Sequence, residues 1–207
     1  TYRADRRRLT LAGQGGTLPD YTNGDAPWKA HMADIQTIET SGINGIGNYA
    51  FQGAQNLLQI KNNTDTERIG DYAFADCGSL KFFDFAPVKQ IGMAAFLNAG
   101  SLTTLAMDQV SVIGPQAFKG CGAIREATFG GLLGGLPEEV FSGCVSLHRV
   151  IVPESVTTIA GRAFSGCQSL YSINIPASVG TIGAGAFSGC TALEKVYFYG
   201  GVPDRWE

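Results

Sequence analysis

The 207-residue sequence lacks several features that define common classes of protein. It contains two histidines, no Cys-x-x-Cys pair and no apolar run of 18 residues. The scarcity of histidine and the lack of a Cys-x-x-Cys pair argue against a zinc site built from closely spaced ligands. The lack of a long apolar run argues against a membrane-spanning helix. Gly-x-Ser-x-Gly and Walker-A motifs are also missing, so no catalytic grouping stands out and no enzyme activity is expected.

Strong charge of either sign is missing as well. There are 15 Lys and Arg against 18 Asp and Glu, which gives a formal net charge of −3. Nucleic-acid-binding domains usually carry a strongly basic face, so no nucleic-acid partner is expected. No linker rich in proline, glycine or serine divides the chain, and a chain of this length can bury its core as one domain.

What the sequence does contain is an internal repeat. A Phe-Ser-Gly-Cys motif begins at Phe141, Phe164 and Phe187. Extending the frame backwards gives seven anchor phenylalanines, spaced 22 or 23 residues apart: Phe51, Phe74, Phe96, Phe118, Phe141, Phe164 and Phe187. A fixed period of this length is typical of stacked repeat architectures. We therefore expect each anchor phenylalanine to fill the centre of one coil of a solenoid.

Each repeat carries the same apolar positions around its phenylalanine. An Ile or Leu lies five residues before it, usually followed by Gly, and a Leu or Ile lies six residues after it. Apolar pairs follow at nine and eleven residues, such as Val150 with Val152 and Ile173 with Ile175. Alternation with period two predicts a strand, and the Ala-Phe segment predicts a tight turn, which we expect to be helical.

These patterns predict an elongated repeat solenoid with a parallel β-sheet on one face and short helical or irregular turns on the other. One repeat cannot bury its own apolar edge, whereas stacked repeats bury a continuous core. We expect residues 1–27 to cap the N-terminal end, with Trp28 beside them, residues 28–198 to form seven to eight units of 22–23 residues, and residues 199–207 to be a tail.

The pattern Ile-Gly-x-x-Ala-Phe-x-Gly-Cys-x-x-Leu-x-x-Ile-x-Ile-Pro resembles the BspA-like class of leucine-rich repeats, and the resemblance covers roughly residues 9–198. It implies a right-handed leucine-rich-repeat coil. Proteins of this class occur on the surfaces of Bacteroidetes, spirochaetes and some mucosal parasites. The resemblance therefore implies a secreted or surface-attached protein, with a lipoprotein anchor as one form of attachment, and adhesion to host extracellular matrix, to another surface protein or to a glycan.

The cysteines share one position of the repeat, three residues after a phenylalanine: Cys77, Cys121, Cys144, Cys167 and Cys190. Ala54 and Ala99 take this position in two other repeats. Exchange between alanine and cysteine marks a small buried packing position. Side chains stacked in this way point in the same direction, which disfavours disulfides, so we predict reduced, shielded thiols.

A dinucleotide fingerprint is matched in letters by Gly45, Gly47 and Ala50. The same Gly and Ala positions recur in later repeats, and no helix of useful length follows. The match is a by-product of the repeat. No cofactor and no metal site are therefore expected.

The solvent-facing positions of the predicted strands are the candidate binding surface. Residues eight and ten after each phenylalanine must face outward if residues nine and eleven face inward. Large or charged side chains of the kinds that anchor interfaces gather there. The candidate ligand-binding residues at these positions are Phe82, Arg149, Ile151, Asn174, Lys195 and Tyr197, and Tyr171 joins them from the row just beside, seven residues after its phenylalanine.

Two hypotheses about function follow. In the first, the strand face of a non-catalytic surface protein binds a protein or a glycan. In the second, the array is a structural spacer or an assembly module of a larger surface protein, and its strand face has no specific ligand. One repeat departs from the pattern. The glycine-rich residues 130–137 replace the usual polar turn and the Ile-Gly pair, which predicts a local change of backbone path.

Overall fold

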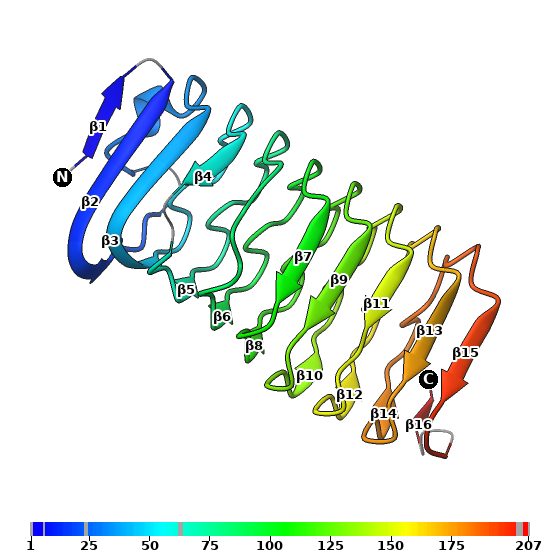
Figure 1. Ribbon diagram of the computed structural model, residues 1–207. Helices are drawn as coiled ribbons and strands as arrows, with labels where there is room; N and C mark the ends of the chain where they lie inside the picture. Colours follow the sequence, from blue (N-terminus) through cyan, green and yellow to red (C-terminus); the bar gives the residue numbers. More distant parts are fainter. Residues whose placement is uncertain (1, 6, 23–24, 62–63, 202–204, 207) are drawn as a thin grey trace.

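The computed structural model describes residues 2–5, 7–22, 25–61, 64–201 and 205–206, and it confirms the predicted solenoid of stacked coils. About eight turns follow one another along a single axis, with the N-terminus at one end and the C-terminus at the other (Figure 1). A regular turn supplies a longer strand, a short strand and a turn segment that carries the phenylalanine, whereas the coil that contains Phe82 has a single bridge in place of the longer strand. The first turn is the least regular, because its strand β3 (Thr37–Ile46) runs through both strand positions.

Two rows of strands run the length of the array. The longer strands are β4 (Gln59–Lys61), β7 (Thr104–Met107), β9 (Glu126–Phe129), β11 (Arg149–Ile151), β13 (Ser172–Ile175) and β15 (Lys195–Phe198). The short strands are β5 (Arg68–Ile69), β6 (Gln90–Ile91), β8 (Val112–Ile113), β10 (Gly135–Leu136), β12 (Thr158–Ile159), β14 (Thr181–Ile182) and β16 (Arg205–Trp206). Pairing within each row is parallel. The short row is broken between β8 and β10, where the irregular residues 130–137 lead into β10.

The N-terminal segment consists mainly of strands. Strands β1 (Tyr2–Asp5) and β2 (Arg8–Thr17) form an antiparallel pair, and β2 pairs in parallel with β3. Trp28 is buried, and its indole Nε1 donates a 2.8 Å hydrogen bond to the Ala50 carbonyl. Its ring stacks on Phe51 at 5.3 Å between centroids, so Trp28 starts the aromatic column of the core.

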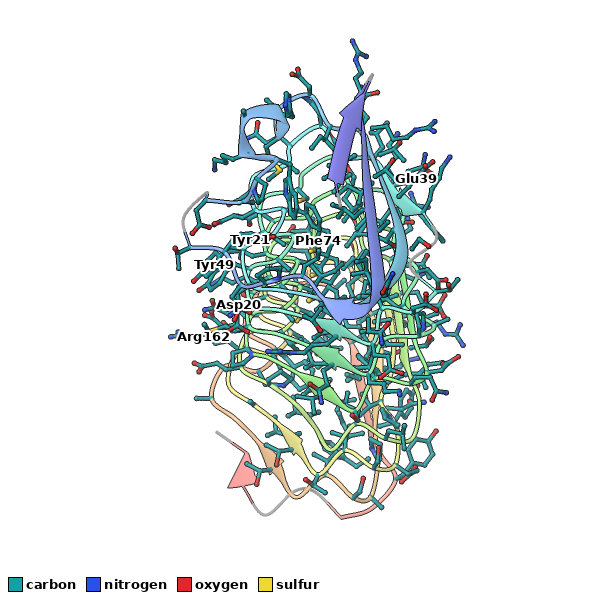
Figure 2. All side chains as sticks on the ribbon, turned by 90° about the vertical axis from the view of Figure 1, so that its left-hand side faces the viewer. Asp20, Tyr21, Glu39, Tyr49, Phe74 and Arg162 are labelled. Carbon is teal, nitrogen blue, oxygen red and sulfur yellow. The ribbon has the colours of Figure 1, made fainter. Side chains whose placement is uncertain are left out.

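The anchor phenylalanines form one continuous stack through the centre of the molecule. Neighbouring rings lie 5.2–5.7 Å apart between centroids and are close to parallel. Phe51, Phe74, Phe96, Phe118, Phe141 and Phe164 are fully buried, whereas Phe187 at the C-terminal end is half-buried. Figure 2 shows Phe74 in the interior, between the side of the solenoid that carries Glu39 and the side that carries Tyr49 and Arg162.

The prediction that the Ala-Phe turns are helical is wrong. Within the described residues the only helix is η1, a 3-10 helix at Lys29–His31. The residue two positions before each anchor phenylalanine has positive φ in all seven repeats: Tyr49, Tyr72, Ala94, Gln116, Glu139, Arg162 and Gly185. A left-handed residue at this point interrupts a right-handed helix. The turn therefore directs its amides towards the next coil rather than along its own backbone.

The glycine that follows the isoleucine of the short strand allows the coils to approach closely. A Cβ atom on Gly70 or Gly92 would lie 2.6 Å from the backbone nitrogen of Asn48 or Asp71 in the preceding coil. Contacts that short do not occur between real side chains and backbone, so these positions exclude any larger residue. Glycine is thus a spacing requirement at Gly70 and Gly92, whereas two other repeats place Pro137 and Ala160 at this position.

Candidate functional site: the strand face

The strand face is the solvent side of the row of longer strands, together with the residues just before and after each strand. Burial alternates along these strands as a period of two requires. Arg149 and Ile151 lie on β11, Asn174 on β13, and Lys195 and Tyr197 on β15, while Tyr171 directly precedes β13. All six side chains are exposed, as is Phe82 in the coil before β7.

Exposed aromatic rings gather on this face. The four most exposed aromatic side chains among the described residues are Phe82 at 61%, Tyr171 at 46%, Tyr197 at 48% and Tyr199 at 69% of their full areas. All four lie on the strand face or directly beyond the end of one of its strands. Aromatic side chains offer large contact areas at low conformational cost, so this is the surface best equipped to hold a partner.

The structure divides the predicted residues into groups. Arg149 forms an ion pair with Glu126 of the preceding coil, and Lys195 Nζ lies 5.8 Å from the centre of the Tyr171 ring. A hydrogen bond with Glu194 raises the pKa of Tyr171, and a slight loss of solvent around the ring and the nearby Tyr197 act in the same direction. β13 and β15 pair so that Asn174 lies beside Tyr197. Phe82 lies several coils away and belongs to a separate place on the face.

The row of longer strands is interrupted twice. Strands β7, β9 and β11 form one sheet, and β13 with β15 forms another, so no strand pairing joins β11 to β13. The second interruption is in the coil that contains Phe82, where a single bridge from Gln59 to Phe82 replaces a strand. Neither interruption was predicted, because the apolar pattern continues through both without change.

A hollow lies at each interruption. The first, which we call the β11–β13 hollow, has a volume of about 410 Å³. Its lining includes Arg149, Ile151 and Asn174, and also His148, Glu154, Ser172, Pro176 and Tyr199. The second, which we call the Phe82 hollow, has a similar volume of about 410 Å³ and lies between residues 81–86 and 103–108. Tyr199 and Glu154 were not among the predicted residues. Tyr199 continues the outward phase of β15, whereas Glu154 lies beyond the end of β11, where the alternation no longer applies.

The opposite side of each coil, which we call the turn face, is joined by a regular ladder of hydrogen bonds. In each repeat three backbone amides, at the phenylalanine and two residues to either side, donate to carbonyls of the next coil over 2.7–3.1 Å. Phe96, for example, donates to Ala117 at 2.8 Å, and Phe118 donates to Val140 at 3.0 Å. The ladder is complete across the six interfaces between the seven phenylalanine turns.

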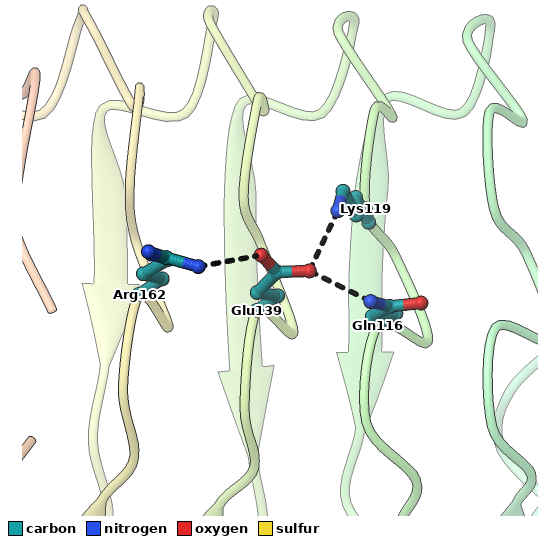
Figure 3. A network of polar contacts seen from close by, with 4 residues as sticks. All are labelled: Gln116, Lys119, Glu139 and Arg162. Carbon is teal, nitrogen blue, oxygen red and sulfur yellow. Dashed lines mark hydrogen bonds and ion pairs between the residues drawn. The ribbon is translucent and has the colours of Figure 1, made fainter. Parts of the chain in front are cut away.

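Charged side chains on the turn face bind one another. Glu139 Oε2 accepts hydrogen bonds from Lys119 Nζ at 2.6 Å and from Gln116 Nε2 at 2.7 Å, and Arg162 lies 3.8 Å from Glu139 Oε1 (Figure 3). The hydrogen bond from Lys119 is the main reason why the pKa of Glu139 is lowered; Gln116 and the charges of Lys119 and Arg162 contribute to the same effect. These groups satisfy one another across three coils.

The cysteines form a column of hydrogen-bond donors beside the phenylalanine stack. Each thiol donates to the carbonyl of a phenylalanine in the preceding coil: Cys77 to Phe51, Cys121 to Phe96, Cys144 to Phe118, Cys167 to Phe141 and Cys190 to Phe164, over 3.0–3.3 Å. All five are free thiols, and all but the half-buried Cys190 are fully buried. Burial raises the pKa of Cys77 and of Cys144 to about 12, which makes these thiols poor nucleophiles at neutral pH.

Across the described part of the chain, no three His, Cys, Asp or Glu side chains gather in a way that could hold a metal ion. No helix among those residues is long and apolar enough to cross a membrane.

Comparisons with known proteins agree with this geometry. The family model for the BspA type leucine rich repeat region matches in six copies, over residues 31–147 and 111–204. No curated protein sequence matches the chain.

Two solved structures share the fold. A leucine-rich repeat protein from Bacteroides ovatus superposes with a TM-score of 0.62 at 19% identity, over 97% of this chain and 70% of its own. The leucine-rich repeat protein of T. pallidum also superposes with a TM-score of 0.62, at 23% identity, over 94% of this chain and 87% of its own. The match of the family model over most of the sequence, on a solenoid whose coils repeat its motif, shows that this chain belongs to the BspA-type leucine-rich repeat family.

Proposed function

We propose that this chain is a non-catalytic binding module of a secreted or cell-surface protein, and that its strand face holds a protein or a glycan in an adhesion-like contact. The observation that carries the proposal is the gathering of the most exposed aromatic side chains on one face of a rigid array. Host extracellular matrix, or another surface protein or glycan, is the partner class that membership of the family favours.

The two faces differ in how far their side chains are already engaged. On the turn face, the charged groups around Glu139 satisfy one another across neighbouring coils. On the strand face, Tyr197 and Tyr199 project into solvent, and two hollows open between coils. Binding through the strand face would bury apolar ring surface without breaking an ion-pair network.

A matched pair of triple variants tests the proposal. Replacement of Arg149, Tyr171 and Tyr197 by alanine removes one arginine and two tyrosines from the strand face. Replacement of Arg162, Tyr49 and Tyr72 by alanine removes the same residue types from the turn face. Binding is measured on immobilised extracellular-matrix proteins and on a glycan array.

The strand-face variant should lose at least about thirtyfold in affinity, the effect of truncating one interface anchor, while the turn-face variant should bind as the wild type does. Loss of binding in the turn-face variant alone would show that the binding site lies on the turn face, which would contradict the proposal. Absence of binding by the wild-type chain to every probe would instead favour a structural spacer.

A further inference from the structure

The β11–β13 hollow is too narrow for an added strand. Cα atoms of β11 and β13 come within 8 Å of one another. A strand inserted between them would need about 9.5 Å, which is two interstrand spacings. Within the described residues no backbone hydrogen bond links β11 to β13. The interruption therefore leaves a slot that suits a compact polar ligand better than an extended peptide.

The side chains around the hollow provide both hydrogen-bond donors and acceptors. Asn174 and Ser172 each provide both, Arg149 and His148 donate, and Glu154 accepts. Arg149 is held in place by its ion pair with Glu126, which fixes one of the donors. Positive and negative side chains are nearly balanced around the hollow. Such a lining can hydrogen-bond the many hydroxyl groups of a neutral ligand, whereas an ion of one sign would meet repulsion from one of the charges.

Aromatic rings lie beside these polar groups. Tyr199 lines the hollow and is 69% exposed, and Tyr197 lies next to Asn174 on the neighbouring coil. A tyrosine ring presents an apolar face with a polar tip. The C–H-rich face of a pyranose ring packs against such a surface while its hydroxyl groups reach the side chains around it.

We propose that the β11–β13 hollow is a saccharide-binding site, in which Asn174, Glu154 and Arg149 bind hydroxyl groups and Tyr199 packs against a sugar ring. The volume of about 410 Å³ lies within the range of known small-ligand sites. This inference rests on the proposed function of the strand face and names its ligand class.

The Phe82 hollow provides an internal control. It has the same volume and the same origin in an interrupted strand row, but Phe82, Phe83, Phe85 and Ala86 make its lining more apolar. The polar side chains Lys81, Asp84, Thr103, Thr104 and Asp108 also line it, but more of its surface is apolar, so it should hold a sugar more weakly. A double variant of Lys81 and Thr104 to alanine removes two exposed side chains from this hollow only.

The test uses an array of mono-, di- and trisaccharides with neutral and sialylated termini, and matrix glycoproteins before and after enzymatic removal of their glycans. Wild-type chain should bind a neutral saccharide, and replacement of Asn174 and Tyr199 by alanine should weaken this binding at least about tenfold. Both side chains are exposed, so circular dichroism and the melting temperature should not change. The control variant of Lys81 and Thr104 should bind as wild type does.

Three results would overturn the inference. Binding to glycoproteins that survives both glycan removal and the Asn174 and Tyr199 double variant would show that the strand face recognises protein, so the proposed function would stand and the saccharide site would not. Loss of saccharide binding in the Lys81 and Thr104 variant alone would assign the saccharide site to the Phe82 hollow. No binding to any of the probes would contradict both the saccharide site and the proposed function.

Discussion

The turn face and the strand face are made by the same repeats, yet neighbouring coils are joined differently on each. On the turn face, three amides per coil donate in one direction to the next coil, and this ladder has no gap from Tyr49 to Ser188. On the strand face, pairing stops twice, and a hollow opens at both places. The comparison indicates that the turns and the phenylalanine stack hold the coils in register, which leaves the strand face free to vary.

The largest effect should come from the stack behind the turn face. Phe141→Ala or Phe164→Ala should lower the free energy of unfolding by about 3–5 kcal/mol, because each ring is fully buried between two others. Phe187→Ala should cost less, since its side chain is half-buried at the end of the stack. Denaturant midpoints compared among the three variants measure this order, and equal losses at all three positions would show that the stack does not end as described.

The left-handed positions of the turn face provide the second prediction. Arg162 has φ of 54°, where a β-branched residue is strongly disfavoured, so Arg162→Val should destabilise by about 1–2 kcal/mol. Arg162→Gly should be neutral or stabilising by up to about 1 kcal/mol, because its ion pair is exposed and contributes little.

Arg149→Val on β11 is the matched control on the strand face. Valine suits a strand, so this change should be close to neutral in denaturant unfolding. Similar losses for Arg162→Val and Arg149→Val would remove the proposed backbone difference between the two faces.

Many of these features could be predicted from the sequence, and the reasons for the exceptions are physical. The periodic apolar positions identified the phenylalanine stack and the alternation along the strands, because burial follows directly from repeat phase. The left-handed turn position was missed because Tyr49, Gln116 and Arg162 share no residue type that marks positive φ. The hollows were not predicted because they occur where backbone pairing between two coils is interrupted, and the apolar pattern is the same whether or not the strands pair.

The glutamate network should add a smaller, pH-dependent stabilisation. The pKa of Glu139 is lowered in the folded protein, so its contacts stabilise at neutral pH and are lost as pH falls through that lowered pKa. Glu139→Gln should therefore cost about 1 kcal/mol at pH 7, and the difference from wild type should vanish at low pH, where Glu139 is itself protonated. Unfolding curves from pH 7 to pH 2 measure this, and a difference that grows towards low pH would contradict the assignment.

The smallest effect on stability should come from the strand face. Replacement of Arg149, Tyr171 and Tyr197 by alanine removes exposed side chains, one exposed ion pair and one cation–ring contact, which together should change the free energy of unfolding by no more than about 1 kcal/mol. Thermal and denaturant unfolding provide the measurement. A loss as large as that of Phe141→Ala would mean that this face, too, holds the coils together.

Native-state hydrogen exchange, read out amide by amide, tests the comparison most directly. The amides of Phe96, Phe118 and Phe141 in the turn ladder should exchange only through global unfolding, and so should Thr128 on β9, which pairs with β7. The amides of Ser172 and Asn174, at the edge of β13 that borders the hollow, should exchange much faster, through local opening. Protection of Ser172 and Asn174 equal to that of Phe118 would show that the strand row is continuous, and would contradict the account of two differently joined faces.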